Sequence, residues 1–232
     1  MGSMSNQFIL RDVSKSYGAT PVLTGINLSI SQGETVAIMG PSGSGKSTLL
    51  HCMSGILQPS SGAILFGGRD IAQLDDAHRS KLRLTQFGFV FQDGQLLPEL
   101  TAVENIALPM ILTGSSKSRA RRAALELLEK LGLAQLANRR PAKMSGGQAQ
   151  RVAVARALVA NPAVIFADEP TGALDQPTGH EMMQLLTSLV AASGTTLIMV
   201  THDAKVASWL NRRVEIRDGI IHDDRMMGGE LR

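Results

Sequence analysis

The chain has 232 residues, of which 44% are hydrophobic and 19% are charged. This length is sufficient for one large domain or two small ones, and the composition excludes an intrinsically disordered protein. The formal net charge of +3 is too small to indicate nucleic-acid binding, so we expect no nucleic-acid partner. No run of 18 apolar residues is present, and the single cysteine, Cys52, excludes an intrachain disulfide. We therefore expect a soluble cytoplasmic chain, in which Met1-Gly2-Ser3 ahead of Met4 is a cloning remnant.

The first part of the chain predicts strands around a glycine-rich turn. Residues 7–38 contain short apolar runs separated by turn residues, which is typical of an antiparallel β region. A buried strand at 35–39 leads into the turn, and a helical pattern begins at Lys46. Cys52 lies in that helix and is interpreted as a small core residue rather than a reactive thiol. Residues 87–91 are predicted to form a further buried strand.

Helix formers dominate the middle of the chain. They fill 102–110 and 118–131, and loop residues separate the two segments at 113–116. The pattern then returns to a strand at 163–167, a helix at about 178–192 and a strand at 196–200. The predicted fold class is therefore α/β, with one domain over 4–232. Its α/β core comprises 4–92 and 161–232, and a helical lobe at about 93–160 is inserted in it.

The glycine-rich turn is the most specific motif, because it has both the required residues and the required strand before and helix after it. Backbone N–H groups of such a turn bind phosphate oxygens, and glycines allow the phosphates to approach closely. Lys46 is placed to reach the outer phosphates, and the Ser47 hydroxyl is placed to hold Mg²⁺. The predicted phosphate-binding residues are Gly40, Pro41, Ser42, Gly43, Ser44, Gly45, Lys46, Ser47 and Thr48.

Two carboxylates follow the apolar strand near residue 164. Asp168 is suited to binding the metal ion, and Glu169 is suited to polarising an attacking water. The competing interpretation is that both are ordinary turn carboxylates. The nearby phosphate turn needs a metal partner, so the sequence favours the catalytic interpretation.

A second helix start has the residues of a capping box. Ser145 is predicted as the N-cap and Gln148 as its reciprocal partner, before the periodic apolar residues of the following helix. Gly146 and Gly147 are poor helix formers, yet they leave bare N–H groups at the positive end of the helix dipole. The sequence therefore predicts a second anion site, which would close over the phosphates bound by a neighbouring subunit in a head-to-tail pair.

Taken together, these motifs resemble the nucleotide-binding subunit of ABC transporters over essentially the whole chain, with a P-loop NTPase core of the RecA-like type. The resemblance implies that Tyr17 stacks on adenine, that Gln92 senses the metal ion and couples to a membrane partner, and that Asp175 communicates across a dimer. It also implies that His202 contacts the γ-phosphate. Met144 stands where the family usually has leucine, an apolar exchange of little consequence.

The segments Leu96-Leu97-Pro98 and Pro170-Thr171-Gly172 look like the subgroup of lipoprotein-releasing, macrolide-exporting and haem-exporting ATPases. This resemblance implies ATP and Mg²⁺ as ligands, a homodimer with ATP at its interface, and a permease with four membrane helices. It places the chain at the cytoplasmic face of a bacterial membrane, where it would drive export or extraction of a hydrophobic or amphipathic molecule, with haem favoured over lipoprotein or antibiotic. The alternatives are a soluble ABC ATPase of cofactor assembly and a cell-division scaffold in which ATP acts as a switch.

Overall fold

The computed structural model describes residues 6–227 and divides the chain into two compact units. Among these residues, the first unit comprises 6–83 together with 194–227, and the second comprises 84–193. Met1-Gly2-Ser3 and Met4, which concern the predicted start of the chain, lie outside the described residues. Within 6–227, no helix combines the length and apolar character needed to cross a bilayer.

The N-terminal residues form an antiparallel sheet in the first unit, as the sequence predicts. Its strands, in the order β2-β1-β4-β5, are β1 (Asn6–Tyr17), β2 (Thr20–Ser31), β4 (Ser61–Phe66) and β5 (Arg69–Asp70). Alternate side chains of β1 such as Phe8 and Leu10 are buried, which is the pattern of a strand with one face on a core. The β4–β5 hairpin is an addition to the prediction, since its strands are short and contain a single buried residue, Ile64.

The first unit also contains a second set of four strands, one of which is the predicted strand at 35–39. In the order β10-β9-β3-β8, they are β3 (Thr35–Met39), β8 (Thr196–Val200), β9 (Arg212–Arg217) and β10 (Ile220–Met226). The apolar run of β8 is buried at every position, and that of β3 at all but the first, as expected for strands covered on both faces. β3 runs parallel to β8 and β9, so the carboxyl ends of these strands lie at one edge. Helices α1 (Lys46–Met53) and α7 (Ala204–Ala207) and the turn η1 (Ile71–Gln73) complete the regular elements of this unit.

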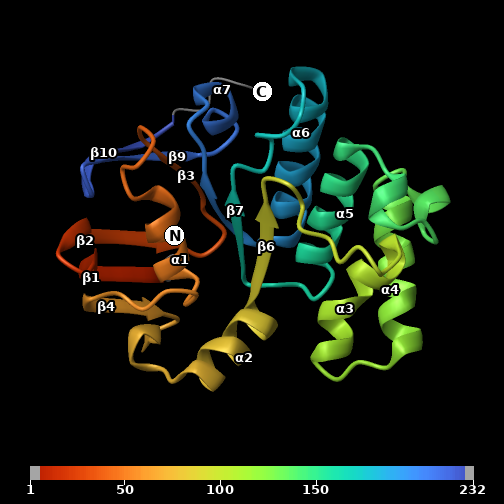
Figure 1. Ribbon diagram of the computed structural model, residues 1–232, viewed down its shortest axis with the longest axis horizontal. Coiled ribbons are helices and arrows are strands. Elements are labelled where there is room, and N and C mark those ends of the chain that lie inside the picture. The colour runs from red at the N-terminus through yellow and green to blue at the C-terminus, as the bar shows by residue number, and fades with distance from the viewer. Residues whose placement is uncertain (1–5, 228–232) are drawn as a thin grey trace, which may run out of the picture. The chain divides into compact units, whose positions relative to one another are not determined.

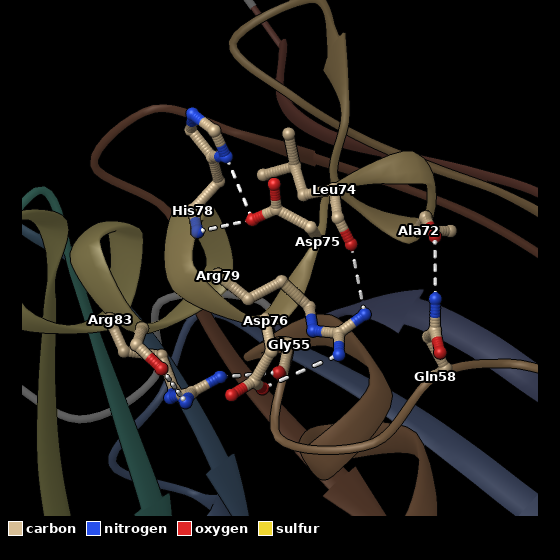
Figure 2. Close-up of polar contacts among 10 residues, drawn as sticks. Gly55, Gln58, Ala72, Leu74, Asp75, Asp76, His78, Arg79 and Arg83 are labelled. Atoms are coloured by element: carbon tan, nitrogen blue, oxygen red, sulfur yellow. Dashed lines mark hydrogen bonds and ion pairs between the residues drawn. The ribbon is translucent and has the colours of Figure 1, made fainter.

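Helix α2 (Asp76–Gln86) carries the chain from the first unit into the second and was missed by the sequence analysis. It has no buried residue, so the sequence shows no apolar stripe that would predict a helix here. Polar contacts hold it instead, as Figure 2 shows. The Asp75 carboxylate accepts a hydrogen bond from the His78 backbone N–H at 2.8 Å, and it lies 2.7 Å from Nδ1 of the same residue. Arg79 donates to the carbonyl of Leu74 at 3.0 Å, and Arg83 donates to that of Gly55 at 2.6 Å.

The second unit contains the parallel strand pair β6 (Phe87–Phe91) and β7 (Val164–Asp168). Its helices are α3 (Ala102–Leu112), α4 (Lys117–Lys130), α5 (Gly146–Leu158) and α6 (Gln176–Ser193), with short turns η2 (Ala134–Leu136) and η3 (Pro141–Lys143). The predicted helices are confirmed to within two residues at each end, and α3 continues through Pro109 to Leu112, two residues beyond its predicted end. α3 and α4 lie side by side in Figure 1, and with α5 they bury one cluster of mostly alanine, leucine and valine side chains.

The helices of this cluster lie within 102–158, inside the predicted lobe at 93–160. The two compact units instead divide at residues 83 and 193. Because compactness and evolutionary insertion are different criteria, the predicted division into core and lobe stays a prediction.

Cys52 is buried in α1, with 1% of its surface exposed, and this burial raises the pKa of its thiol to about 11. The thiolate is the reactive form, so we expect the native chain to resist alkylation at neutral pH. The expected result is no labelling by iodoacetamide in buffer and one label per chain in guanidinium chloride, measured by intact mass. Because ionisation is disfavoured only in the folded state, stability should also fall as the pH rises from about 9 toward about 11. Rapid labelling of the native chain would contradict the burial of this residue.

Candidate functional site

The predicted phosphate loop joins the carboxyl end of β3 to the start of α1. Gly40, Gly43 and Gly45 have φ values of 149°, 79° and 99°, which side chains rarely tolerate. The Lys46 ammonium is folded back over the loop, where it donates to the Pro41 carbonyl at 2.8 Å, and the residue is only 8% exposed. Gly45 caps α1 without a side-chain hydrogen bond, and the start of such a helix is a typical anion-binding position.

The Ser44 hydroxyl provides a test of whether a phosphate fits this loop. It is buried, and within residues 6–227 it has no hydrogen-bond partner. A buried hydroxyl without a partner is costly, whereas a phosphate oxygen reaching the loop would accept a hydrogen bond from it. The loop therefore has the donors that a nucleoside triphosphate requires.

A hairpin turn supports the phosphate loop from the side, and the sequence analysis missed it. The Gly219 N–H donates to the Ser44 carbonyl at 3.3 Å, and the Gly219 carbonyl accepts from the Thr24 N–H at 2.9 Å. Asp218 and Gly219 both have positive φ, at 47° and 76°, as a tight turn between β9 and β10 requires. The signal was present in the sequence, because Asp-Gly between two strand-forming runs is a strong hairpin marker.

Tyr17 and His202 also lie in the first unit. Tyr17 is the last residue of β1 and is 51% exposed. The Lys15 ammonium lies 5.3 Å from the centre of its ring, within cation–π range. His202 follows β8, and the phosphate loop follows the neighbouring parallel strand β3. Both therefore leave the same edge of the sheet, which is where open α/β sheets bind ligands.

In the second unit, the strand pair brings Gln92 and Asp168 to one edge. Phe91 is the register partner of Asp168, and Gln92 directly follows Phe91. Glu169 directly follows the last residue of β7 and has a φ of 49°, in the left-handed region. A turn then forms in which the Gly172 N–H donates to the Glu169 carbonyl at 2.9 Å. The Gln92 side chain packs against this turn, since a Cβ on Gly172 would lie 3.0 Å from its Nε2.

Asp175 follows the same turn and directly precedes α6. Its carboxylate accepts a hydrogen bond from the Thr178 N–H at 2.9 Å. Hydrogen bonds from the Thr178 side chain and backbone lower the pKa of Asp175, so the residue is anionic at neutral pH.

The capping box predicted at the start of α5 is confirmed. The Gln148 N–H donates to the Ser145 hydroxyl at 3.3 Å, and the Ser145 N–H donates to the Gln148 side chain at 3.1 Å. Ser145 and Gly146 are exposed, so this helix start faces solvent. Gly147 is confined, because a Cβ there would lie 2.6 Å from the Thr178 methyl group. The two glycines therefore serve different needs, access at Gly146 and close packing at Gly147.

A cation site built only from protein carboxylates, histidines or cysteines is absent from residues 6–227. The predicted ligands Ser47, Gln92 and Asp168 instead offer one hydroxyl, one amide and one carboxylate oxygen. That donor set suits Mg²⁺, which binds few protein oxygens and keeps water or phosphate oxygens for the rest of its shell.

A sequence profile described as ABC transporter matches residues 23–172, which is more than half of the chain and includes the phosphate loop, the α5 start and Asp168-Glu169. The chain belongs to the ABC transporter family.

Curated relatives of this ABC ATPase point to transporter ATP-binding subunits. This chain is 45% identical over 225 residues to the lipoprotein-releasing system ATP-binding protein LolD of Geobacter metallireducens, and the match covers 95% of this chain and 100% of that protein. It is 48% identical over 219 residues to the macrolide export ATP-binding/permease protein MacB of Marinobacter nauticus, covering 93% of this chain and 34% of that longer protein.

A solved structure has the same fold. It is a dimeric post-hydrolysis state of the ATP-binding cassette MJ0796 bound to ADP and Pi, with a TM-score of 0.87 and 42% identity. The match covers 96% of this chain and 99% of that chain. The predicted fold class is thereby confirmed as a cassette with an antiparallel N-terminal sheet and an α/β P-loop core. The chain is an ATP-binding subunit with ATPase activity.

Proposed function

We propose that two copies of this ABC ATPase bind ATP and Mg²⁺ between them in a head-to-tail dimer, and that hydrolysis separates the copies. The exposed, capped start of α5 carries this proposal, because a single chain already has one phosphate loop and its second anion site faces solvent. The dimeric state of the cassette MJ0796 supports it. The dimer is formed by residues 4–232 acting as one nucleotide-binding domain, with the lobe at about 93–160 carrying the second anion site.

Binding is proposed to rest on the first unit. Tyr17 stacks its exposed ring on adenine, and residues 40–48 surround the phosphates with backbone N–H groups. The Lys46 ammonium exchanges the Pro41 carbonyl for phosphate oxygens, which places its charge where negative charge grows during phosphoryl transfer. His202 donates a hydrogen bond to the γ-phosphate.

Hydrolysis is proposed to rest on the second unit. Glu169 accepts a proton from the attacking water and orients it in line with the leaving oxygen. Ser47, Gln92 and Asp168 would hold Mg²⁺, which would offset the negative charge of the phosphates. Ser145, Gly146, Gly147 and Gln148 complete the site of the opposite copy, and Asp175 reports its state across the interface.

The work of the cycle is proposed to act on a membrane partner. The relatives named for lipoprotein release and macrolide export support a permease partner and a hydrophobic or amphipathic cargo. Haem, lipoprotein and antibiotic all belong to that class, and haem is our proposed cargo by resemblance alone. The ATPase would then reside at the cytoplasmic face of a bacterial membrane, held there by its permease.

Affinity purification of the tagged chain from detergent-solubilised membranes of its native host tests this partnership. We expect mass spectrometry to identify an integral-membrane permease with four membrane helices in amounts comparable to the ATPase. The exposed Glu129→Gln variant serves as a matched control that should recover the same partner. Recovery of soluble partners alone would contradict the transport role and favour a cofactor-assembly ATPase or a cell-division scaffold.

A further inference from the structure

Gln150 is a buried amide that no role described so far explains. It lies in α5, two residues beyond the capping residue Gln148, and it is only 2% exposed. An amide is costly to bury unless its polar atoms have partners. Its Nε2 donates to the Phe91 carbonyl at 2.8 Å and to the Pro170 carbonyl at 2.7 Å, so both of its N–H groups are used.

The two acceptors are the backbone neighbours of proposed catalytic residues. Phe91 directly precedes Gln92, and Pro170 directly follows Glu169. Phe91 is the last residue of β6, and Pro170 lies just beyond the end of β7. One side chain on α5 therefore joins the carboxyl ends of two strands, which lie next to each other beside α5 in Figure 1.

Further contacts hold the segment after Gln92 to the same helix. Arg156 of α5 donates to the carbonyls of Gly94 at 2.9 Å and Gln95 at 2.8 Å. A Cβ on Gly94 would lie 3.2 Å from Oε1 of Gln150, so the loop backbone passes close to this amide. The backbone on both sides of Gln92 is thus hydrogen-bonded to α5, at Phe91 before it and at Gly94 and Gln95 after it. The Gln92 side chain packs on the turn at Gly172.

We propose that Gln150 is a positioning residue for ATP hydrolysis, which fixes Gln92 and Glu169 relative to each other and to the Ser145–Gln148 turn. The proposal rests on the proposed roles of those residues. The amide acts through backbone carbonyls and does not itself touch the nucleotide. Because α5 begins with the turn that contacts the opposite copy, the same amide transmits closure of the dimer to the two strand ends.

The test compares Gln150→Met with the wild-type chain in steady-state ATP hydrolysis. Methionine keeps the length and apolar bulk of the side chain but donates no hydrogen bond. We expect kcat to fall about tenfold while KM for ATP changes by less than about twofold, because the phosphate loop is in the other unit. An unchanged kcat, or a loss confined to KM, overturns the proposal.

A double-mutant cycle with Gln92→Ala separates positioning from general destabilisation. If Gln150 acts through Gln92, Gln150→Met should lower kcat by less than about threefold in the Gln92→Ala background. An equal tenfold loss in both backgrounds overturns the proposal and leaves the proposed function intact. If Gln92→Ala alone hydrolyses ATP at the wild-type rate, the role given to Gln92 fails, and the positioning proposal fails with it.

Asn105→Leu is the matched control, and Gln150→Asn is the milder variant. Asn105 is a fully buried amide of the same unit that donates to the carbonyls of Leu97, Leu100 and Thr101, none adjacent to a proposed catalytic residue. Asn105→Leu should lower the melting temperature but should not show the tenfold fall in kcat expected for Gln150→Met. Gln150→Asn keeps an amide that is one methylene shorter and reaches one carbonyl, so it should fold and show an intermediate kcat. A wild-type kcat in Gln150→Asn together with a tenfold loss in Asn105→Leu overturns the proposal.

Discussion

Replacing Glu169 by glutamine is expected to lower the rate of ATP hydrolysis by about 10²- to 10⁴-fold, the usual contribution of a general base. Glutamine has the size of glutamate and can hold the same backbone, but its amide cannot accept the proton of the attacking water. Because the phosphate loop is unaltered, ATP binding should persist. Phosphate release assays measure the first effect, and binding of a fluorescent ATP analogue measures the second.

The same variant should also change the oligomeric state. If ATP joins two copies and hydrolysis separates them, Glu169→Gln should elute as a dimer with ATP, whereas the wild-type chain should return to monomer as ATP is consumed. Glu129→Gln, at an exposed position of α4, is the control and should match the wild type in both assays. Wild-type turnover by Glu169→Gln would remove the general-base assignment.

Replacing Gly40 by alanine is expected to abolish nucleotide binding. A Cβ at this position would lie 2.0 Å from the Ile216 carbonyl oxygen and 2.8 Å from the Ser44 hydroxyl, and the φ of 149° already disfavours a side chain. Backbone atoms of β9 cannot move aside without disrupting the sheet, so the phosphate loop must shift instead. We expect the affinity for ATP to fall more than about 100-fold, measured by isothermal titration calorimetry.

Gly67→Ala is the control for this substitution. Gly67 also has a positive φ, of 54°, but a Cβ there would meet no atom within 4 Å. It should lower stability by about 1 kcal/mol through backbone strain alone and leave ATP binding unchanged. Equal effects of the two alanines would show that strain, and not the contact with Ile216, decides the outcome at Gly40.

Regular elements with an apolar pattern could be predicted from the sequence, and polar or short ones could not. The strand at 87–91 is predicted at the bounds observed for β6, because five consecutive residues are apolar or glycine. Helix α2 was missed because it has no buried face, and its contacts come from residues as distant as Gly55. Such long-range polar contacts leave no local pattern in a single sequence.

The candidate site also has parts that could be predicted from the sequence and parts that could not. The capping box at Ser145 and Gln148 was predictable because both partners lie within one turn. The supports of the site were not, since Gly219 reaches Ser44 and Gln150 reaches Phe91 across large separations in the chain. Arg156 has no motif of its own, and only the fold reveals which carbonyls it binds.

The left-handed backbone of Glu169, with a φ of 49°, lowers the free energy of unfolding of this protein. Outside glycine and asparagine such a conformation costs about 1 kcal/mol or more, so glycine would be the more stable residue there. Glycine cannot accept a proton. If Glu169 acts as the proposed general base, the chain therefore gives up folding free energy to place a proton acceptor at this position.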